Sequence, residues 1–562
     1  MEDGTNLSNS NLKTFDNFYA DLAQSAYNGR PNAFPRYNNA VNWKLIDYSQ
    51  HKNYAGEITP GGKHLPHNGR VYLQPDPDLR DTYKVTSIPV PDANGMRQDV
   101  HHKRYQKGLL TDDEAGFSAY YLTDTPTLTN DTKKTYMTIR GSDAISKENW
   151  NDWIDNDAKF ALNHIHTPQA KLATVGMKTK IAEMREKAPQ ATMDITGHSL
   201  GTIVSAQGVA GLTDEELEKI GKVVLFDGPD TTKSLKKMGL SDEKIKKISE
   251  KIEYYVNPFD VVGMLNREHT ITKLPGDSDE PLKKPVGKVN VLVPLHYTQI
   301  TDPESSHDFG VFQSDGKGNL LTASEDFHPE LLRAGEKLAR LIATSLDSLR
   351  ALGVDENVAA NILNSIMRGE FKIKAAIGYG VYENFTTEYS KIVEEARKES
   401  IKWDREAIPR YQEQLRSGNL SGNQRILVRA QLLQTAAQLA NFDMEDKVKS
   451  VKTLLSDAKE DIQNMIKETR QTAFDMVGYL SSSEVTNLLS GFDTTSFWDE
   501  GVASDTKTAA TSFLTQIEQL GESLVKASGS FETIDTDSAE DFNNLLADVK
   551  QTWRGKNVSP NG

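Results

Sequence analysis

The chain has 562 residues, of which 37% are hydrophobic and 26% charged, and this length favours two or more folded domains over a single core. Its formal net charge of −15 argues against nucleic acid as the main partner, because a phosphate backbone requires a basic surface. The chain has no cysteine, which excludes disulfide bonds, thiolate metal ligands and cysteine-based catalysis.

The beginning of the chain combines one helix pattern with a long region of weak periodicity. Apolar residues recur at helical spacing in residues 15–27, which predicts an amphipathic helix. Residues 28–110 are rich in proline, glycine, asparagine, histidine and tyrosine, and we expect an irregular insertion with short strands. The histidines of this insertion lack metal-binding spacing, and we interpret them as solvated loop residues: His51, His64, His67, His101 and His102.

The first six residues are acidic and polar. They have neither the basic nor the apolar part of a secretory signal peptide, so we expect no cleavable signal. The sequence also contains no apolar run of about 18 residues, and we expect no transmembrane helix.

From residue 116 onward, short apolar segments alternate with helix patterns. The segments 116–123, 135–140, 222–226 and 252–256 are rich in valine, isoleucine and tyrosine or bounded by turn residues, as is typical of strands. A helix is predicted over residues 169–188. Strands separated by helices predict βαβ units, so we expect an α/β domain with a mostly parallel sheet.

The clearest motif of the chain is Gly-His-Ser-Leu-Gly at residues 197–201, between a strand-like and a helix-like segment. This context is typical of a nucleophile elbow, a strained turn that exposes a serine, so Ser199 is the candidate nucleophile. Gly197 and Gly201 flank it because a side chain there would collide with the neighbouring strand or helix. The backbone N–H of Leu200 is a candidate donor to an oxyanion.

A serine nucleophile needs a base to take its proton and an acid to orient that base. In α/β-hydrolases the acid and then the base follow the serine in chain order. We favour Asp260, just beyond the segment 252–256, as the acid, and Asp227 is the alternative. We favour His307, in a polar loop, as the base over three other downstream histidines: His269, His296 and His328. This chemistry requires no metal or cofactor.

Three motifs occur together: the elbow, Arg-Gly-Ser at 140–142 followed by Trp-Asn-Asp-Trp-Ile-Asp at 150–155, and Asn-Pro-Phe-Asp-Val-Val at 257–262. Their combination resembles the class 3 (fungal-type) lipase family over roughly residues 12–320. The resemblance implies an α/β-hydrolase fold and a lipid ester substrate, with the roles of nucleophile, acid and base carried by Ser199, Asp260 and His307. It also implies that Ser142 and Leu200 supply the oxyanion hole.

After about residue 329 the strand patterns end. Helices are predicted over 330–352, 356–368, 382–416 (kinked or broken at Pro409) and 542–553. The clearest helix pattern is a heptad seam, which predicts a helix that packs along its length on another helix. The seam consists of Val448, Val451, Leu455, Ala458, Ile462, Met465, Thr469, Ala473, Met476 and Leu480, and a similar pattern recurs at 510–524. We expect an all-α helical bundle or helical hairpin.

Two domains are therefore predicted: a lipase-like α/β-hydrolase domain at 1–325 and an all-helical domain at 326–562. Their order, in a chain without cysteine or signal peptide, resembles lipase toxins exported by type VII secretion systems, with a helical targeting domain similar to the LXG type at the carboxyl end. That resemblance implies secretion without a cleavable signal peptide and small helical secretion partners for residues 326–562. It also implies an immunity protein for the producing cell and the lipid of competing bacteria as target.

Other hypotheses use the same residues. A soluble small-ester hydrolase or an acyltransferase would need the same three side chains. A protein of another class, a helical adaptor whose hydrolase-like half is inactive and only binds, would keep the fold without them. The order of Ser199, Asp260 and His307 favours a serine-dependent lipid ester hydrolase, of triacylglycerol lipase or phospholipase A type.

Overall fold

The computed structural model describes residues 14–15, 17–35, 42–52, 58–60, 65–92, 95–141, 167–302, 305–315, 318–354, 376–418, 420, 422–476 and 478–530. A mixed α/β sheet domain is followed by a long helical region, which confirms the predicted fold class. The chain divides into two compact units, Met1–Ser400 and Ile401–Gly562. The predicted helices at 356–368 and 542–553 lie outside the described residues.

The first unit is built on a mixed sheet in the order β13-β12-β11-β10-β9-β8-β7-β6-β5, with β4 beside β8 and β1 beside β4. Strands β9 to β13 are parallel, and β8 is antiparallel to β9. The strands of the sheet are β1 (Lys44–Asp47), β4 (Arg70–Leu73), β5 (Arg80–Asp92), β6 (Gly95–Lys107), β7 (Thr111–Asp112), β8 (Phe117–Thr123), β9 (Lys134–Ile139), β10 (Thr192–His198), β11 (Ile220–Phe226), β12 (Ile252–Val256) and β13 (Lys288–Val291). Because the carboxyl ends of parallel strands meet at one edge of a sheet, the segments that follow β9 to β12 come close together.

Helices cover the parallel part of this sheet, as its buried strands require. The helix α1 packs against β9, β10 and β11, and α3 and α4 pack against each other, with α4 also on β10. The helices of this unit are α1 (Phe18–Ser25), α3 (Pro168–Lys187), α4 (Leu200–Ala210), α5 (Asp214–Leu217), α6 (Thr232–Lys237), α7 (Asp242–Ser249) and α8 (Pro329–Ala351). A core cluster joins α1 to the sheet and includes Phe18, Tyr136, Phe226 and Phe309.

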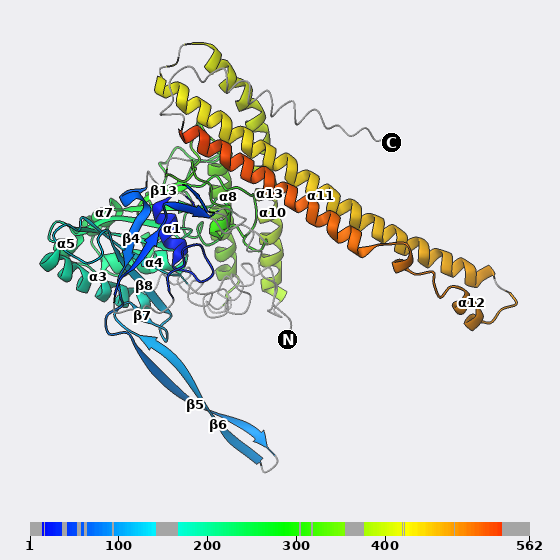
Figure 1. Cartoon of the computed structure of the whole chain (residues 1–562), viewed down its shortest axis with the longest axis horizontal. Coiled ribbons are helices and arrows are strands. Elements are labelled where there is room, and N and C mark those ends of the chain that lie inside the picture. The colour runs from blue at the N-terminus through cyan, green and yellow to red at the C-terminus, as the bar shows by residue number, and fades with distance from the viewer. Residues whose placement is uncertain are drawn as a thin grey trace. The chain divides into compact units, whose positions relative to one another are not determined.

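The insertion predicted as irregular with short strands contains a long two-stranded ribbon instead. Strands β5 and β6 pair along their whole length, from Arg80 opposite Lys107 to Asp92 opposite Gly95. Figure 1 shows the ribbon extending away from the rest of the sheet. Around residue 84 both faces of the ribbon are exposed: Tyr83 is 63% and Val85 59% exposed on one face, and the side chain of Lys84 on the other face is 56% exposed. No buried face imposes an alternation of apolar and polar residues there.

The first compact unit continues past the predicted domain boundary at residue 325. The helix α8 and the first part of α10 (Ala376–Arg416) belong to it, and its last residue, Ser400, lies within α10. Helix α10 continues through Pro409, where the sequence predicts a kink or a break.

The second unit consists of helices. Helix α11 (Gly422–Met476) packs along α13 (Glu500–Ser530), with the short α12 (Ser482–Leu488) between them in the chain (Figure 1). A core cluster joins the end of α10 to the first part of α11 through Ala407, Tyr411, Val428, Leu432 and Leu433. Among the helices that the structure describes, none combines the length and the apolar character needed to cross a membrane.

Candidate active site

Ser199 lies in a sharp turn between β10 and α4. Its backbone has φ 59° and ψ −130°, a conformation that residues other than glycine rarely adopt. A Cβ atom at Gly197 would lie 2.8 Å from the carbonyl oxygen of Gly201, and a Cβ atom at Gly201 would overlap the carbonyl oxygen of Ile139. The strand and helix approach this closely only because both positions are glycine. The local structure is that of a nucleophile elbow.

The structure brings Ser199, Asp260 and His307 together, and we call these three residues the candidate triad. The Nε2 atom of His307 lies 2.8 Å from Oγ of Ser199, and Nδ1 lies 3.0 Å from Oδ2 of Asp260. When Nδ1 carries the imidazole proton, it donates to the carboxylate, and Nε2 accepts from the serine hydroxyl. This is the geometry in which an imidazole can remove the serine proton.

The carboxylate of Asp260 is held by its own loop. Its Oδ1 atom accepts the backbone N–H of Val262 at 3.0 Å, and Oδ2 accepts that of Gly263 at 2.7 Å. The side chain of Asp260 is fully buried, and Ser199 and His307 are almost completely buried. The two N–H donors compensate the burial of the carboxylate and fix the direction in which it faces His307.

Asp227, the alternative acid, lies just after β11 with φ 47°, and its Oδ1 atom accepts the backbone N–H of Asn257 at 2.7 Å. Burial raises the pKa of this carboxyl well above its usual range, and the charge of Asp260 raises it further. The hydrogen bond from His307 goes to Asp260, so the geometry favours Asp260 for this role.

The three other candidate bases lie elsewhere. Nδ1 of His328 lies 2.7 Å from a carboxylate oxygen of Glu330, in a separate buried cluster. His269 is exposed, and its backbone N–H donates to Glu336. His296 is buried in the segment after β13. Of the candidate histidines, His307 is the one that the structure places on the serine.

Of the two predicted oxyanion-hole residues, Leu200 is among those that the structure describes. Leu200 directly follows the nucleophile and is the first residue of α4, so its backbone N–H is one of the first four of the helix, which have no partner within the helix itself. Ser142 lies outside the described residues, as does the segment 150–155.

Two residues that the sequence analysis did not select connect the loops of the site. The hydroxyl of Tyr27 lies 3.0 Å from Nδ1 of His198 and accepts the backbone N–H of Gly141 at 3.1 Å. The Nε2 atom of His198 lies 2.9 Å from the carbonyl oxygen of His307. With the proton on Nε2, His198 donates to that carbonyl and accepts from the tyrosine, so both ring nitrogens are satisfied.

Burial lowers the pKa of His198 well below its usual value, and the nearby His307 lowers it further, which keeps the ring neutral. His198 stands inside the elbow motif, and Tyr27 ends the first predicted helix, but no sequence pattern links positions 171 residues apart. Periodicity reports which face of an element is buried and carries no information on which polar groups meet across the fold.

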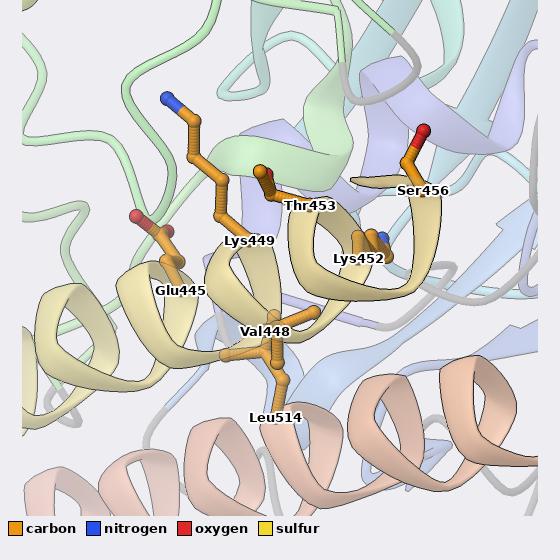
Figure 2. A pocket seen from close by; sticks show the side chains of 7 residues that line it. All are labelled: Glu445, Val448, Lys449, Lys452, Thr453, Ser456 and Leu514. Carbon is orange, nitrogen blue, oxygen red and sulfur yellow. The ribbon is translucent and has the colours of Figure 1, made fainter. Parts of the chain in front are cut away.

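A shallow cleft in the helical unit offers no comparable chemistry. It is lined by Glu445, Val448, Lys449, Lys452, Thr453 and Ser456 of α11 and by Leu514 of α13. In Figure 2, Val448 points toward Leu514, while Glu445 and Lys449 point away from the contact of the two helices. The residues that line it include no histidine that could act as a base for a hydroxyl nucleophile.

Residues 141–269 match the family model of the cutinases, a serine-hydrolase α/β family. The match supports a carboxylic ester hydrolase in general, and the matched residues include Ser199, Asp227 and Asp260 but end before His307. No curated protein and no solved structure matches the chain. The resemblance to class 3 lipases and to exported toxins stays a prediction.

Proposed function

We propose that the protein is a serine-dependent lipid ester hydrolase in which Ser199 is the nucleophile, His307 the base and Asp260 the acid. The observation that carries this proposal is the continuous contact from Oγ of Ser199 through the ring of His307 to the carboxylate of Asp260. The cutinase match over residues 141–269 supports ester hydrolysis as the reaction class.

In the proposed reaction, Oγ of Ser199 attacks the ester carbonyl carbon while Nε2 of His307 takes the hydroxyl proton. The carbonyl oxygen becomes an oxyanion, which the backbone N–H of Leu200 and a second donor at residue 142 would stabilise, each by about 3 kcal/mol. His307 then protonates the departing alcohol, and the acyl group stays on the serine. A water molecule, deprotonated by His307, releases the carboxylic acid and restores the hydroxyl.

We propose an acylglycerol or a phospholipid as the substrate class, on the basis of the combined elbow, Arg-Gly-Ser and Asn-Pro-Phe-Asp motifs. The experiment compares the purified protein with Ser199→Ala on a short soluble ester, a triacylglycerol emulsion and phospholipid vesicles. Fatty acid release from the emulsion or the vesicles that requires Ser199 supports a lipase or a phospholipase, respectively. Cleavage of the short ester alone would indicate a small-ester hydrolase.

Ser234→Ala is the matched control for Ser199→Ala. Ser234 is buried in the same unit, and its hydroxyl donates to the carbonyl of Thr231 at 2.9 Å, away from the candidate triad. The same change of a buried serine there should leave turnover intact. Loss of activity in both variants would point to a general effect on folding, and no serine-dependent release from any substrate would contradict the proposed function.

We also propose that the helical region binds small helical proteins during export by a type VII route, and that the producing cell needs an immunity protein. Large apolar side chains exposed on the second unit support a protein-binding surface: Leu454, Met465, Leu488, Phe513 and Leu520 are between 47% and 74% exposed. Co-purification of a candidate helical partner with the wild-type chain, and its loss in Leu454→Glu, would test this proposal. Equal binding by both chains would place the partner elsewhere.

A further inference from the structure

The carbonyl oxygen of Phe259 is a meeting point of three segments of the first unit. Phe259 directly precedes Asp260, and its carbonyl accepts the hydroxyl of Ser306 at 3.0 Å. Ser306 directly precedes His307. The same carbonyl accepts the hydroxyl of Tyr389, which comes from α10. The loop that carries the acid and the loop that carries the base are therefore joined one residue before each functional side chain.

The hydroxyl of Tyr389 also holds the loop of the base from a second point. It accepts the backbone N–H of Ile300 at 2.9 Å, seven residues before His307. Tyr389 is 3% exposed, and its ring packs on that of Phe385, one helical turn earlier, with the ring centres 5.7 Å apart. A buried hydroxyl that both donates and accepts is fixed in direction, and so are the groups it bonds.

The part of α10 that carries Tyr389 is itself attached to the first unit. The hydroxyl of Ser400 bonds both the carboxylate of Glu330 and the hydroxyl of Tyr297. Two ion pairs, Arg333 with Glu399 and Lys337 with Glu395, lie along the exposed side of α8 and α10. Exposed pairs add little stability, so the buried bonds of Ser400 and the buried apolar side chains of this part of α10, such as Phe385 and Ala396, contribute more to its attachment.

We propose that Tyr389 is a positioning residue for the candidate triad, which holds the loops of Asp260 and His307 in register through the Phe259 carbonyl and the Ile300 N–H. This inference rests on the proposed function and adds that catalysis depends on a helix outside the part of the chain that matches the cutinases. A displacement of about 1 Å between reacting groups can cost on the order of 100-fold in rate. Tyr389 acts through the two loops, because its hydroxyl contacts Phe259, Ile300 and Ser306.

Tyr389→Phe tests the proposal, because it removes the hydroxyl and keeps the ring. We expect kcat on a short soluble ester to fall roughly 10- to 100-fold, with little change in KM. Tyr48→Phe is the matched control: its hydroxyl bonds that of Ser25 at 2.9 Å, and Tyr48 is 1% exposed. Both variants lose one buried hydroxyl, so a loss of stability alone would lower kcat equally in the two.

A second readout does not depend on turnover. The N–H of His307 that faces Asp260 should give a far-downfield proton resonance in NMR spectra, assigned by its absence in His307→Ala. We expect Tyr389→Phe to shift or broaden this resonance and Tyr48→Phe to leave it unchanged. Wild-type kcat and an unchanged resonance in Tyr389→Phe would overturn the positioning role while the proposed function stood. A wild-type protein without serine-dependent turnover would refute the proposed function, and the resonance would still decide the positioning role.

The shared carbonyl offers one more discriminating variant. Ser306→Ala removes the other hydroxyl that bonds the carbonyl of Phe259. If both hydroxyls position the same two loops, the losses of kcat in the single variants should not multiply in the double variant Tyr389→Phe/Ser306→Ala. Losses that multiply fully would mean that the two residues act independently, which contradicts the shared role.

Discussion

His198 shows how one buried side chain couples the elbow to the loop of the base. It is 1% exposed, its ring lies 4.4 Å from that of Phe309 and 4.9 Å from that of His307, and both ring nitrogens are bonded. Burial lowers the pKa of His198 in the folded chain below its value in the unfolded chain. At a pH between the folded and the unfolded pKa of His198, the unfolded chain therefore binds one proton more than the folded chain. The stability that neutral His198 contributes is fully present above about pH 6.5 and is lost as the pH falls below it.

We therefore predict that His198→Gln weakens the acid sensitivity of the fold. Its amide can still donate to the carbonyl of His307 but cannot take up a proton. Below about pH 6.5 the free energy of unfolding of the wild type should fall more steeply than that of the variant, by up to about 1.4 kcal/mol per pH unit. Urea unfolding at a series of pH values measures both slopes, and equal slopes would show that His198 does not titrate in this range.

The two carboxyl groups near His307 should differ in their effect on catalysis. The printed geometry gives His307 its carboxylate contact through Asp260, whereas Asp227 accepts the backbone N–H of Asn257 and burial raises its pKa, so Asp227→Asn should keep most of kcat. Asp260→Asn removes the acceptor that fixes the imidazole tautomer and should lower kcat on the order of 10⁴-fold. Steady-state kinetics of the two variants on one ester decide the assignment. A large loss in Asp227→Asn with a benign Asp260→Asn would reverse it.

At the scale of elements, the elbow depends on the close approach of β9 and α4. Gly201→Ala would place a methyl group on the carbonyl oxygen of Ile139, which cannot move without disturbing the ladder of β9. We predict a loss of about 1–3 kcal/mol of unfolding free energy together with a loss of turnover. The same substitution at Gly380 of α10, where a Cβ atom meets nothing within 4 Å, should be neutral or stabilising by up to about 1 kcal/mol. Thermal unfolding of both variants measures the contrast.

In the first unit, the sequence predicts the strands and helices that bury a face in the core. It does not predict those whose faces are exposed. The segments 135–140 and 252–256 correspond to β9 and β12, because buried valine, isoleucine and tyrosine leave a local signal. For the ribbon of β5 and β6 the sequence predicts only short strands, since side chains such as Tyr83 and Val85 face solvent and leave no pattern of a buried face. The contacts of Tyr27, Phe259 and Tyr389 depend on residues far apart in the chain, and no local pattern encodes them.

At the scale of the whole molecule, the chain has a catalytic candidate in one compact unit and a separate helical core in the other. The sequence predicts this division by the end of the strand patterns, but it places the boundary at 325, before α8. The amphipathic pattern of α8 shows that one face is buried and does not show which unit buries it. Eleven of its residues are buried, including Leu331, Leu338 and Ile342, and the helix belongs to the first unit.

We predict that the two units can be destabilised separately. Leu432 is 1% exposed in the core cluster of the second unit, and Leu432→Ala should cost about 2–5 kcal/mol of that unit's stability. The kcat on a soluble ester should stay at the wild-type level, because the candidate triad lies in the first unit. Leu454→Ala, at a position 67% exposed on α11, is the matched control and should change little. Denaturant unfolding, monitored once by activity and once by helix content, measures this difference. If Leu432→Ala lowers the midpoints of both transitions equally, the units are not separate.

If Ser199 is a nucleophile activated by His307, it should react with a fluorophosphonate ester. In this reaction Oγ of the serine displaces fluoride and forms a phosphonyl ester, which mass spectrometry locates in the chain. We predict one label on Ser199, none in Ser199→Ala, much slower labelling in His307→Ala and a wild-type rate in Asp227→Asn. A wild-type protein that stays unlabelled, carries the label on another serine, or reacts no faster than His307→Ala would contradict it.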